Sequence, residues 1–293
     1  MKILVTGANG FLGRCIVEDL KKDYSVASLS RQKSDYNCDL TKGKPFLDDF
    51  FDYVIHVAGK AHVVPKNECE EKEFFDVNVQ GTINLLKSLE EKPPKTFVFM
   101  STVAVYGKEF GEMIDENTPL NGKTAYAKSK ILAEREVINF GRKYNTGVVI
   151  LRLPLVIGKS PKGNLKLLIK AIKKGYYFRI GKGDAKRSMV AAKDITKLLA
   201  TLCGKEGIYN ITDRRHPSFK EIDTAISSFY GKKIKVLPEI FIKILAKLGD
   251  LIPLFPFNSY KYQKMTSSLT FLDDKAVKEL NWSPQDAIKS IEL

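Results

Sequence analysis

The chain has 293 residues, 44% of them hydrophobic, which is enough to bury a sizeable core as one large α/β domain, alone or with a smaller partner. Its four cysteines are scattered without a Cys-x-x-Cys pair, so neither a disulfide framework nor a metal site is expected, and the cytoplasm is the predicted compartment. The net charge of +14 comes mostly from lysines spread along the chain, which favours a solvated surface over nucleic-acid binding. No stretch supplies the roughly 20 apolar residues of a membrane-spanning helix.

Short apolar runs alternate with longer amphipathic stretches in the first half of the chain. The runs predict buried strands at 2–6, 24–29, 52–58, 96–101 and 147–151. Apolar residues that recur every three or four positions predict helices at 11–22, 70–91 and 125–144. Repeated βαβ units of this kind predict an α/β fold with a Rossmann-type, doubly wound parallel sheet.

The pattern changes in the second half, where helices are joined by a few short strand candidates such as 207–212 and 234–237. This change predicts a smaller C-terminal lobe that binds the substrate. We expect residues 1–154 to form the dinucleotide-binding domain, with the chain returning to it at about 185–203. Residues 155–293 should mainly build the substrate-binding lobe.

A glycine-rich turn joins the first strand to the first helix, with the sequence Thr-Gly-Ala-Asn-Gly-Phe-Leu-Gly over residues 6–13. The first glycine permits a tight turn, the second lets the backbone approach a pyrophosphate, and the third allows the helix to pack closely on the strand. The start of the helix offers unpaired N–H groups to the anion. The turn therefore predicts dinucleotide contacts from Gly7, Asn9, Gly10, Phe11, Leu12 and Gly13.

The end of the second strand indicates which dinucleotide is bound. An NAD site usually carries Asp or Glu there, whereas this chain has Ser30 and Arg31. The guanidinium of Arg31 suits a 2′-phosphate, so NADP is favoured and NAD remains possible; the alternative is that Arg31 is an ordinary exposed loop residue. Asp39, followed by Leu40, is a candidate for the adenine contact, or else another exposed loop acid.

A tyrosine and a lysine lie four residues apart on one face of a predicted helix, at Tyr126 and Lys130. A lysine ammonium, together with an oxidised nicotinamide, favours phenolate and brings the tyrosine pKa towards the working pH. Ser101 and Thr102 follow the strand at 96–101, at the strand end where doubly wound folds bind ligands. The three groups Thr102, Tyr126 and Lys130 are the predicted catalytic residues.

The motifs together resemble the extended short-chain dehydrogenase/reductase family, of the NAD-dependent epimerase/dehydratase type that includes nucleotide-sugar 4-ketoreductases and 4-epimerases. The resemblance spans nearly the whole chain. It rests on the glycine turn and on His56-Val-Ala-Gly59, Asn78-Val-Gln-Gly-Thr82, Ser101-Thr102 before Val105-Tyr-Gly107, Tyr126-x-x-x-Lys130 and Leu280-x-Trp282-x-Pro284.

The resemblance implies a role for several individual residues. Tyr126 would be the acid/base, Lys130 the partner that holds the nicotinamide ribose, and Thr102 the hydroxyl that binds the reacting sugar oxygen. Further cofactor contacts are implied for Ala58, Gly59 and Pro154, and substrate contacts near the diphosphate for Asn164 and Arg187. Dimerisation through the helices at 70–91 and 125–144 is typical of the family.

The function expected first is an NADP-dependent 4-ketoreductase of a UDP- or dTDP-linked 4-keto-6-deoxysugar, in surface polysaccharide synthesis. This expectation depends on Arg31, because a net reductase must exchange its cofactor. The alternatives are a 4-epimerase of UDP-glucose or UDP-N-acetylglucosamine, which returns its hydride to the same sugar, and a non-catalytic dinucleotide-binding protein. The intact catalytic residues argue against the last.

Three other features have two interpretations each. His56 lies on an apolar strand and is expected to be a packed residue rather than a catalyst, whereas His62 could reach the sugar pocket. The stretch 241–248 is basic and amphipathic, which fits either a helix facing the core of the lobe or attachment to a membrane surface. We expect the core-facing helix.

Overall fold

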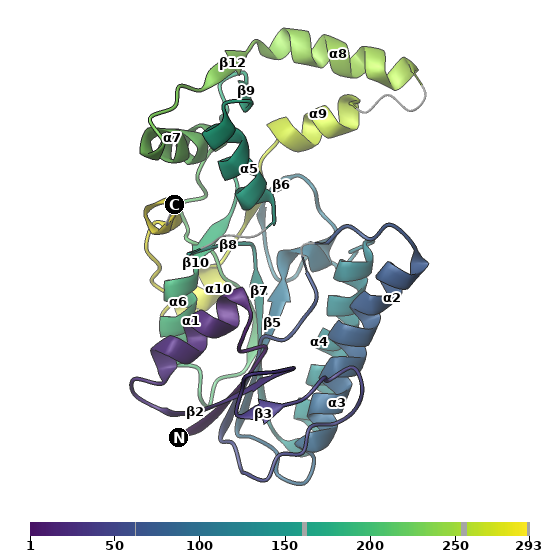
Figure 1. The fold of residues 1–293 in the computed structure, drawn as a ribbon, viewed down its shortest axis with the longest axis vertical. Coiled ribbons are helices and arrows are strands. Elements are labelled where there is room, and N and C mark those ends of the chain that lie inside the picture. The colour runs from purple at the N-terminus through teal and green to yellow at the C-terminus, as the bar shows by residue number, and fades with distance from the viewer. Residues whose placement is uncertain (62, 160–162, 253–256, 292–293) are drawn as a thin grey trace.

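A seven-stranded parallel sheet forms the centre of the molecule (Figure 1). The computed structural model describes residues 1–61, 63–159, 163–252 and 257–291. The strand order is β11-β7-β5-β4-β1-β2-β3, and every neighbouring pair is parallel. The strands are β1 (Lys2–Thr6), β2 (Ser25–Ser30), β3 (Tyr36–Asn37), β4 (Tyr53–His56), β5 (Thr96–Thr102), β7 (Gly147–Leu153) and β11 (Gly207–Asn210).

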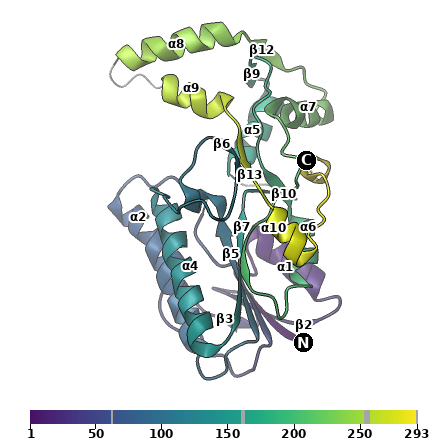
Figure 2. The same cartoon turned by 180° about the vertical axis from the view of Figure 1, so that it is seen from behind.

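Helices cover both faces of this sheet, as the two opposite views show (Figures 1 and 2). One face carries α1 (Phe11–Leu20), α6 (Ala192–Leu199) and α10 (Asp274–Leu280). The other carries α2 (Glu68–Phe75), α3 (Gly81–Ser88) and α4 (Ala125–Tyr144). The arrangement confirms the predicted doubly wound α/β fold. The strand order reverses between β1 and β4, and the crevice at that point is where such folds bind ligands.

The predicted helix at 70–91 is interrupted. Between α2 and α3 the chain forms a π-helical turn, η1 (Asp76–Gln80), in which one extra residue widens the helix. Asn78 lies in this turn and is buried. The apolar periodicity did not reveal the turn because η1 continues the helical rod on both sides.

The strand at 207–212 was expected in the smaller lobe, but the structure places it in the main sheet. Its residues 207–210 form β11, which pairs with β7 at the edge of the main sheet. Trp282 returns to the same core and donates its indole N–H to the carbonyl of Thr212, at 2.8 Å. The apolar pattern of the sequence identified the strand. Which sheet the strand joins depends on its pairing with β7, which is distant in sequence.

The rest of the chain extends beyond one end of the sheet. It contains two-stranded parallel pairs and four helices among the described residues. The pairs are β6 (Gly111–Ile114) with β13 (Leu269–Phe271), β8 (Leu155–Ile157) with β10 (Met189–Ala191), and β9 (Phe178–Ile180) with β12 (Lys235–Leu237). The helices are α5 (Gly163–Lys174), α7 (Phe219–Phe229), α8 (Glu239–Leu251) and α9 (Ser259–Thr266). Two short 3-10 helices, η2 (Val103–Tyr106) and η3 (Ala287–Ser290), complete the described elements.

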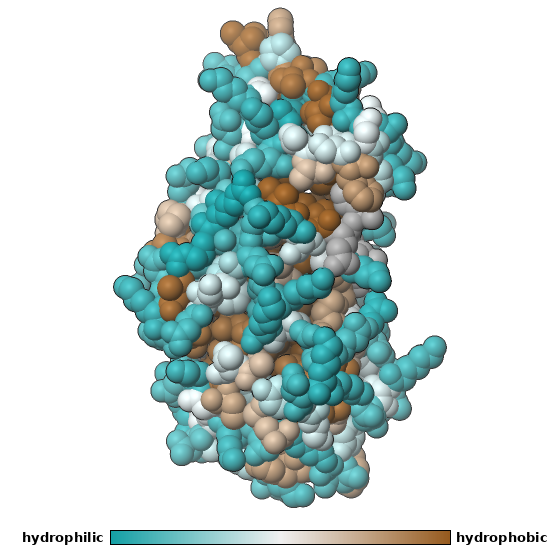
Figure 3. Space-filling model, turned by 90° about the vertical axis from the view of Figure 1, so that its left-hand side faces the viewer, coloured by the Kyte–Doolittle hydropathy of each residue, from teal (hydrophilic) through white to brown (hydrophobic). Residues whose placement is uncertain are grey.

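The amphipathic stretch at 241–248 lies in α8, and it is not the core-facing helix that the sequence analysis preferred. Most of its apolar side chains are exposed. Hydrophobic side chains accordingly gather at the far end of the molecule in Figure 3, where Figure 1 places α8 and β12.

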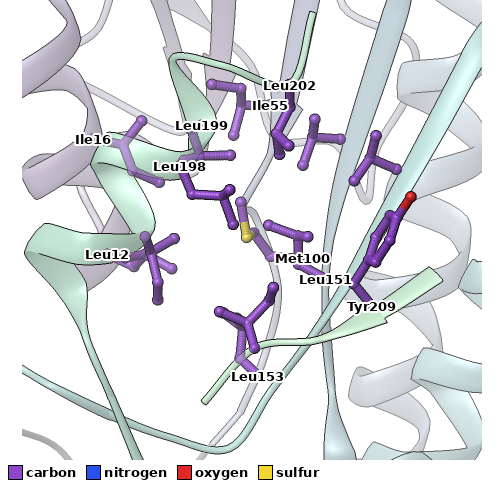
Figure 4. Close-up of a cluster of buried hydrophobic side chains, with 14 of the residues drawn as sticks. Leu12, Ile16, Ile55, Met100, Leu151, Leu153, Leu198, Leu199, Leu202 and Tyr209 are labelled. Atoms are coloured by element: carbon purple, nitrogen blue, oxygen red, sulfur yellow. The ribbon is translucent and has the colours of Figure 1, made fainter. Parts of the chain in front are cut away.

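The main core lies between the sheet and the α1 side (Figure 4). Met100 and Leu151 from neighbouring strands meet Leu198 and Leu199 of α6, while Tyr209 comes from β11. All five side chains are buried. This core holds the carboxyl ends of β1, β4 and β5 in fixed positions, and the candidate site is built there.

Candidate active site

The glycine turn forms a cradle that only glycine allows. Gly7 has φ +66°, and a Cβ there would lie 2.7 Å from the backbone of Ala58, at the end of β4. A Cβ on Gly13 would lie 2.2 Å from the carbonyl oxygen of Gly7. Gly10 is the N-cap of α1 and carries no side chain that could occupy the helix end. The N–H groups of this end are therefore open to an anion, and the cradle fits a dinucleotide pyrophosphate.

The end of β2 is tied to the glycine turn. The Asn9 amide donates to the Ser30 hydroxyl, at 3.2 Å. Arg31 is exposed beside it, and no carboxylate occupies the last position of the strand. Asp39 is half-buried; hydrogen bonds from Thr41 lower the pKa of its carboxyl, and the positive charge of Arg31 adds to the effect. The structure thus brings Arg31 and Asp39 to the edge where the adenosine end of a dinucleotide would lie.

Phe11, Leu12 and Leu40, which were also predicted to contact the cofactor, are packed against other parts of the protein. Phe11 contacts Gly158, where a Cβ would lie 3.1 Å from its ring, and Leu12 belongs to the main core. Leu40 is buried, and its carbonyl accepts a hydrogen bond from Asn84 at 2.7 Å.

Thr102 and Tyr126 meet at the carboxyl end of β5. Thr102 ends the strand, and its hydroxyl also accepts from the Ala104 amide at 3.2 Å, which begins η2. Tyr126 lies in the first turn of α4, whose N-cap Thr124 accepts from the Ala127 amide. Burial raises the pKa of Tyr126, and its hydrogen bond with Thr102 opposes the rise. Tyr126 lies beside Phe74, with ring centroids 6.1 Å apart, and burial there disfavours the charged phenolate. The lowered pKa predicted from the sequence applies to the site with an oxidised nicotinamide bound, and it stays a prediction.

Lys130 is 5% exposed, one helical turn after Tyr126. Its Nζ lies 4.2 Å from the centroid of the Phe99 ring, and 3.7 Å from where a Cβ of Gly59 would be. Burial lowers the pKa of Lys130 to about 8, against an opposing effect of Glu134. Because Gly59 has no side chain, space is left beside the Lys130 ammonium group. A ligand in that space could contact the ammonium, as the predicted role of Lys130 in holding the nicotinamide ribose requires.

Asn78 connects these groups, and the sequence analysis gave it no role. Its Oδ1 accepts from the Lys60 amide at 2.7 Å, while its Nδ2 donates to the Lys60 carbonyl and to the Ser129 hydroxyl at 2.9 Å. Ser129 precedes Lys130 and donates to the carbonyl of Tyr126. The π-helical turn thus holds the loop after β4 against the catalytic helix. The Asn-Val-Gln-Gly-Thr motif was the available signal.

His56 is a packed residue, as expected. Its Nδ1 lies 2.6 Å from the Thr6 hydroxyl and its Nε2 lies 2.9 Å from the Thr82 hydroxyl. Thr82 donates its own hydrogen to the Asn78 carbonyl, so Nε2 carries the imidazole proton and Nδ1 accepts from Thr6. Burial lowers the pKa of His56 to about 3. The neutral ring cross-links β1 and β4 to α3, directly after the turn that contains Asn78.

The remaining predicted residues are Pro154, Asn164, Arg187 and His62, and Pro154 directly follows Leu153, the partner of Thr102 in the sheet. Pro154 is half-buried between β7 and β8, and Asn164 is exposed in the first turn of α5. Arg187 donates to the carbonyls of Lys186, Ser267 and Lys264 and lies 4.7 Å from the Phe219 ring centroid. Burial lowers its pKa, and it has no ion pair with any acid that the structure describes. His62 lies outside the described residues.

The amino-acid sequence matches the model of the NAD dependent epimerase/dehydratase family over residues 3–212. The N-acetyl-alpha-D-glucosaminyl-diphospho-ditrans,octacis-undecaprenol 4-epimerase of Escherichia coli O157:H7 is 29% identical over 247 residues, which cover 79% of this chain and 73% of that protein. The UDP-glucose 4-epimerase of Vibrio cholerae is 29% identical, over 98% of this chain and 92% of its own. The solved structure of RMD from Pseudomonas aeruginosa complexed with NADPH has a TM-score of 0.74 at 21% identity, covering 99% of this chain and 96% of that one.

The family model spans the glycine cradle, the Thr102 strand and the helix of Tyr126 and Lys130, so the match covers the parts from which the site is built. It confirms the resemblance that the motifs indicated. The chain is an enzyme that belongs to the NAD dependent epimerase/dehydratase family.

Proposed function

We propose that the protein is a 4-epimerase of a sugar that is carried on a diphosphate. The observation that carries the proposal is that Tyr126 interacts with Thr102 at the end of β5, while Lys130 lies buried one turn further along α4, beside Gly59. Two similar proteins of different organisms are both named as 4-epimerases, one acting on UDP-glucose and the other on a polyprenyl-diphosphate-linked N-acetylglucosamine. This proposal reverses the order expected from the sequence, where the 4-ketoreductase stood first.

Each residue of the cluster has a defined task in this reaction. Tyr126, as the phenolate, would take the proton from the C4 hydroxyl of the sugar, and the resulting phenol would return that proton to the C4 oxygen after the sugar has rotated in the site. Thr102 would hold the C4 oxygen by a hydrogen bond. Lys130 would hold the nicotinamide ribose and bring positive charge close to Tyr126. A bound nicotinamide dinucleotide supplies the uptake and return of the hydride at C4.

The proposed substrate is an anion, and the chain is strongly basic. Arg187 is the residue that we propose for the diphosphate, because its guanidinium is half-buried without an acidic partner among the described residues. An anion in contact with it would replace the lost hydration and form charge-assisted hydrogen bonds. Asn164 in the first turn of α5 is proposed as a second contact.

One observation favours a second candidate, the NADP-dependent 4-ketoreductase of a UDP- or dTDP-linked 4-keto-6-deoxysugar. Arg31 is exposed at the end of β2, where no carboxylate is available for a ribose 2′-hydroxyl. A guanidinium there suits the 2′-phosphate of NADP. NADP is therefore the cofactor that we propose for this candidate, and NAD is the natural choice for the epimerase.

Product analysis separates the two candidates. The purified protein should convert UDP-N-acetylglucosamine, UDP-glucose or polyprenyl-diphosphate-linked N-acetylglucosamine into the 4-epimer without added cofactor. Stoichiometric loss of NADPH absorbance with a 4-keto-6-deoxysugar, and no epimer, would replace the epimerase by the reductase. Dinucleotide binding without turnover of either class would instead identify a non-catalytic protein.

The family resemblance also supports a homodimer through α2, α3 and α4, a cytoplasmic location and a role in surface polysaccharide synthesis. We propose all three on that basis. Sedimentation of the purified chain tests the dimer: a monomer at micromolar concentration would contradict it.

A further inference from the structure

The helix α8 exposes a wide hydrophobic face that no other described element covers. Ala246 and Gly249 are buried and Ile242 is partly buried, and this side packs against α9. The other apolar side chains recur every three or four residues, so they share a different face. Phe241 is 66% exposed and Leu251 is 78% exposed. The same face carries Ile240, Ile244, Leu245 and Leu248.

The apolar surface continues beyond the helix. Val236 of β12 and Met265 of α9 are also half-exposed. Figure 3 shows hydrophobic side chains grouped at this end of the molecule. Soluble proteins rarely leave so large a contiguous apolar patch uncovered unless it binds something.

Lysines border this face. Lys243 and Lys247 are exposed on the polar side of α8, one helical turn apart. The segment 229–264 contains seven lysines and only two acidic residues. Both acids are engaged within the protein, since Glu239 accepts from the Tyr262 hydroxyl and Asp250 accepts from the Ser259 amide. The border of the hydrophobic face is therefore positively charged.

We propose that α8 and its lysine border bind the surface of an anionic lipid bilayer, with the helix lying in the plane of the interface. Interfacial helices combine a broad apolar face with lysines along the polar side. Phe241 and Leu248 would enter the acyl boundary, while Lys243 and Lys247 would meet lipid phosphates. With 13 residues, α8 is about 20 Å long, which is shorter than a bilayer core.

None of the described helices is long and apolar enough to cross a membrane. The proposed attachment is therefore peripheral.

The charge of the border favours a bilayer over a second copy of the chain. In a two-fold contact the same patch would face itself, so the lysine-rich borders would repel each other. An anionic membrane instead attracts juxtaposed lysines, each of which adds to the binding.

The position of α8 links this surface to the candidate active site. Both α8 and α9 project over the same side of the molecule as α2 and α4 in the two opposite views (Figures 1 and 2). Lys264 of α9 forms an ion pair with Glu109, which follows the η2 segment beside Thr102. This ion pair ties α9, on which α8 packs, to the segment that follows the end of β5.

Binding to vesicles tests the surface directly. The full chain, purified, should co-sediment with vesicles of mixed phosphatidylglycerol and phosphatidylcholine, and not with phosphatidylcholine alone. The double variant Phe241→Glu, Leu248→Glu should weaken this partitioning by about tenfold or more, since two apolar side chains no longer leave water. The matched control is Phe46→Glu, Phe50→Glu, which changes two exposed phenylalanines of the β3–β4 loop and should bind like the parent chain.

Charge is tested separately by Lys243→Ala, Lys247→Ala. This variant should bind more weakly, and its binding should respond less steeply to added salt than that of the parent chain. Circular dichroism and thermal unfolding should show that all variants keep the fold, which the exposure of the changed residues leads us to expect.

Three outcomes would overturn the proposal. The parent chain could fail to bind anionic vesicles, or the α8 and β3–β4 loop variants could bind equally well. The third outcome is a self-association of the parent chain that Phe241→Glu, Leu248→Glu abolishes, which would make the face an interface between copies. A dimer through α2, α3 and α4 would persist in that variant.

One consequence concerns the substrate class, and it rests on the proposed function. A membrane-bound enzyme could act on a diphosphate-linked sugar whose carrier lipid is embedded in the bilayer. Phe241→Glu, Leu248→Glu should then lower kcat/KM for a vesicle-embedded polyprenyl-diphosphate sugar and leave kcat/KM for the soluble UDP-sugar unchanged. Vesicle binding without any epimerisation would refute the proposed function and leave the docking surface standing.

Discussion

The carboxylate of Glu134, which lies one turn of α4 beyond Lys130, accepts two hydrogen bonds from the guanidinium of Arg152. The distances are 3.2 Å from Nε and 2.8 Å from Nη2, and both side chains are almost fully buried. Arg152 also donates to the Tyr106 hydroxyl at 3.1 Å, and Tyr106 donates to Asn210 of β11. The pair thus connects the catalytic helix with the edge of the sheet.

Replacing one partner of this pair should be much more damaging than replacing both. Arg152→Met leaves the Glu134 charge buried and unpaired, so the free energy of unfolding should fall by about 3–5 kcal/mol. The double variant Glu134→Leu, Arg152→Met should recover most of the loss because no buried charge remains. Urea unfolding of the three proteins measures both changes. Equal stability of the single and double variants would show that the unpaired charge of Glu134 is not the cause of the loss.

Tyr126→Phe should abolish most of the turnover without affecting the cofactor. Removal of a positioned acid/base costs about 10²–10⁴ in rate, so kcat should fall by that factor. The dissociation constant of the dinucleotide should stay close to the parent value, as fluorescence titration would show. Tyr176→Phe, at an exposed position, is the control and should be fully active. Substantial activity of Tyr126→Phe would exclude the acid/base role.

Lys130 should lower the stability of the fold at neutral pH. Its folded-state pKa of about 8 lies below the ordinary value of 10.5, so the unfolded chain binds more protons between these two values. The cost is fully present below pH 8 and disappears as the pH rises towards 10.5. Lys130→Met should therefore raise the free energy of unfolding at pH 7 by roughly 2–3 kcal/mol while removing activity.

The gain from Lys130→Met should shrink steadily in urea titrations at pH 8, 9 and 10. Lys128→Met, on the exposed side of the same helix, should show neither the gain nor its pH dependence. A gain that did not vary with pH would mean that packing, not ionisation, distinguishes the two variants.

His56 should make the protein sensitive to mild acid. Its folded-state pKa of about 3 lies below the ordinary 6.5, so its contribution is complete above pH 6.5 and is lost as the pH falls towards 3. The loss should reach roughly 2 kcal/mol at pH 5. In His56→Gln this part of the pH dependence should vanish, whereas the parent chain should show it. Paired unfolding curves at pH 5 and pH 7 provide the measurement.

Gly13→Ala should destroy the cradle. The new Cβ would lie 2.2 Å from the Gly7 carbonyl oxygen, so α1 must move away from β1. Overpacking of this kind costs about 1–3 kcal/mol, and dinucleotide affinity should fall by about tenfold or more in calorimetric titration. Gly43→Ala meets no atom within 4 Å and should bind the dinucleotide normally. Unchanged affinity in Gly13→Ala would contradict the assigned cradle.

The elements that the sequence predicted well are those whose signal is local. The alternation of apolar and polar residues located β1, α1 and α4, and the glycine spacing located the cradle between two of them. The interruption by η1 was missed because it depends on the contacts that Asn78 makes with Lys60 and Ser129, which are distant in sequence.

The same distinction holds for the site. Thr102 and Tyr126 were predicted from motifs, and their roles stay predictions, whereas the upward shift in the pKa of Tyr126 depends on its surroundings in three dimensions. The stretch that forms α8 was predicted to be amphipathic from its periodicity alone. Periodicity shows that two faces differ, but the direction in which the apolar face points depends on where α9 packs.

The pairing of β11 with β7 has a consequence for how the chain is made. During synthesis the ribosome releases β7 well before residues 207–210. Until those residues emerge, the backbone groups on the β7 edge of the sheet stay unpaired. Trp282, which closes the same core, emerges later still. The enzyme can therefore complete its core only after residue 282 has left the ribosome, and a chain that stops before Trp282 would be a substrate for proteases and not a smaller enzyme.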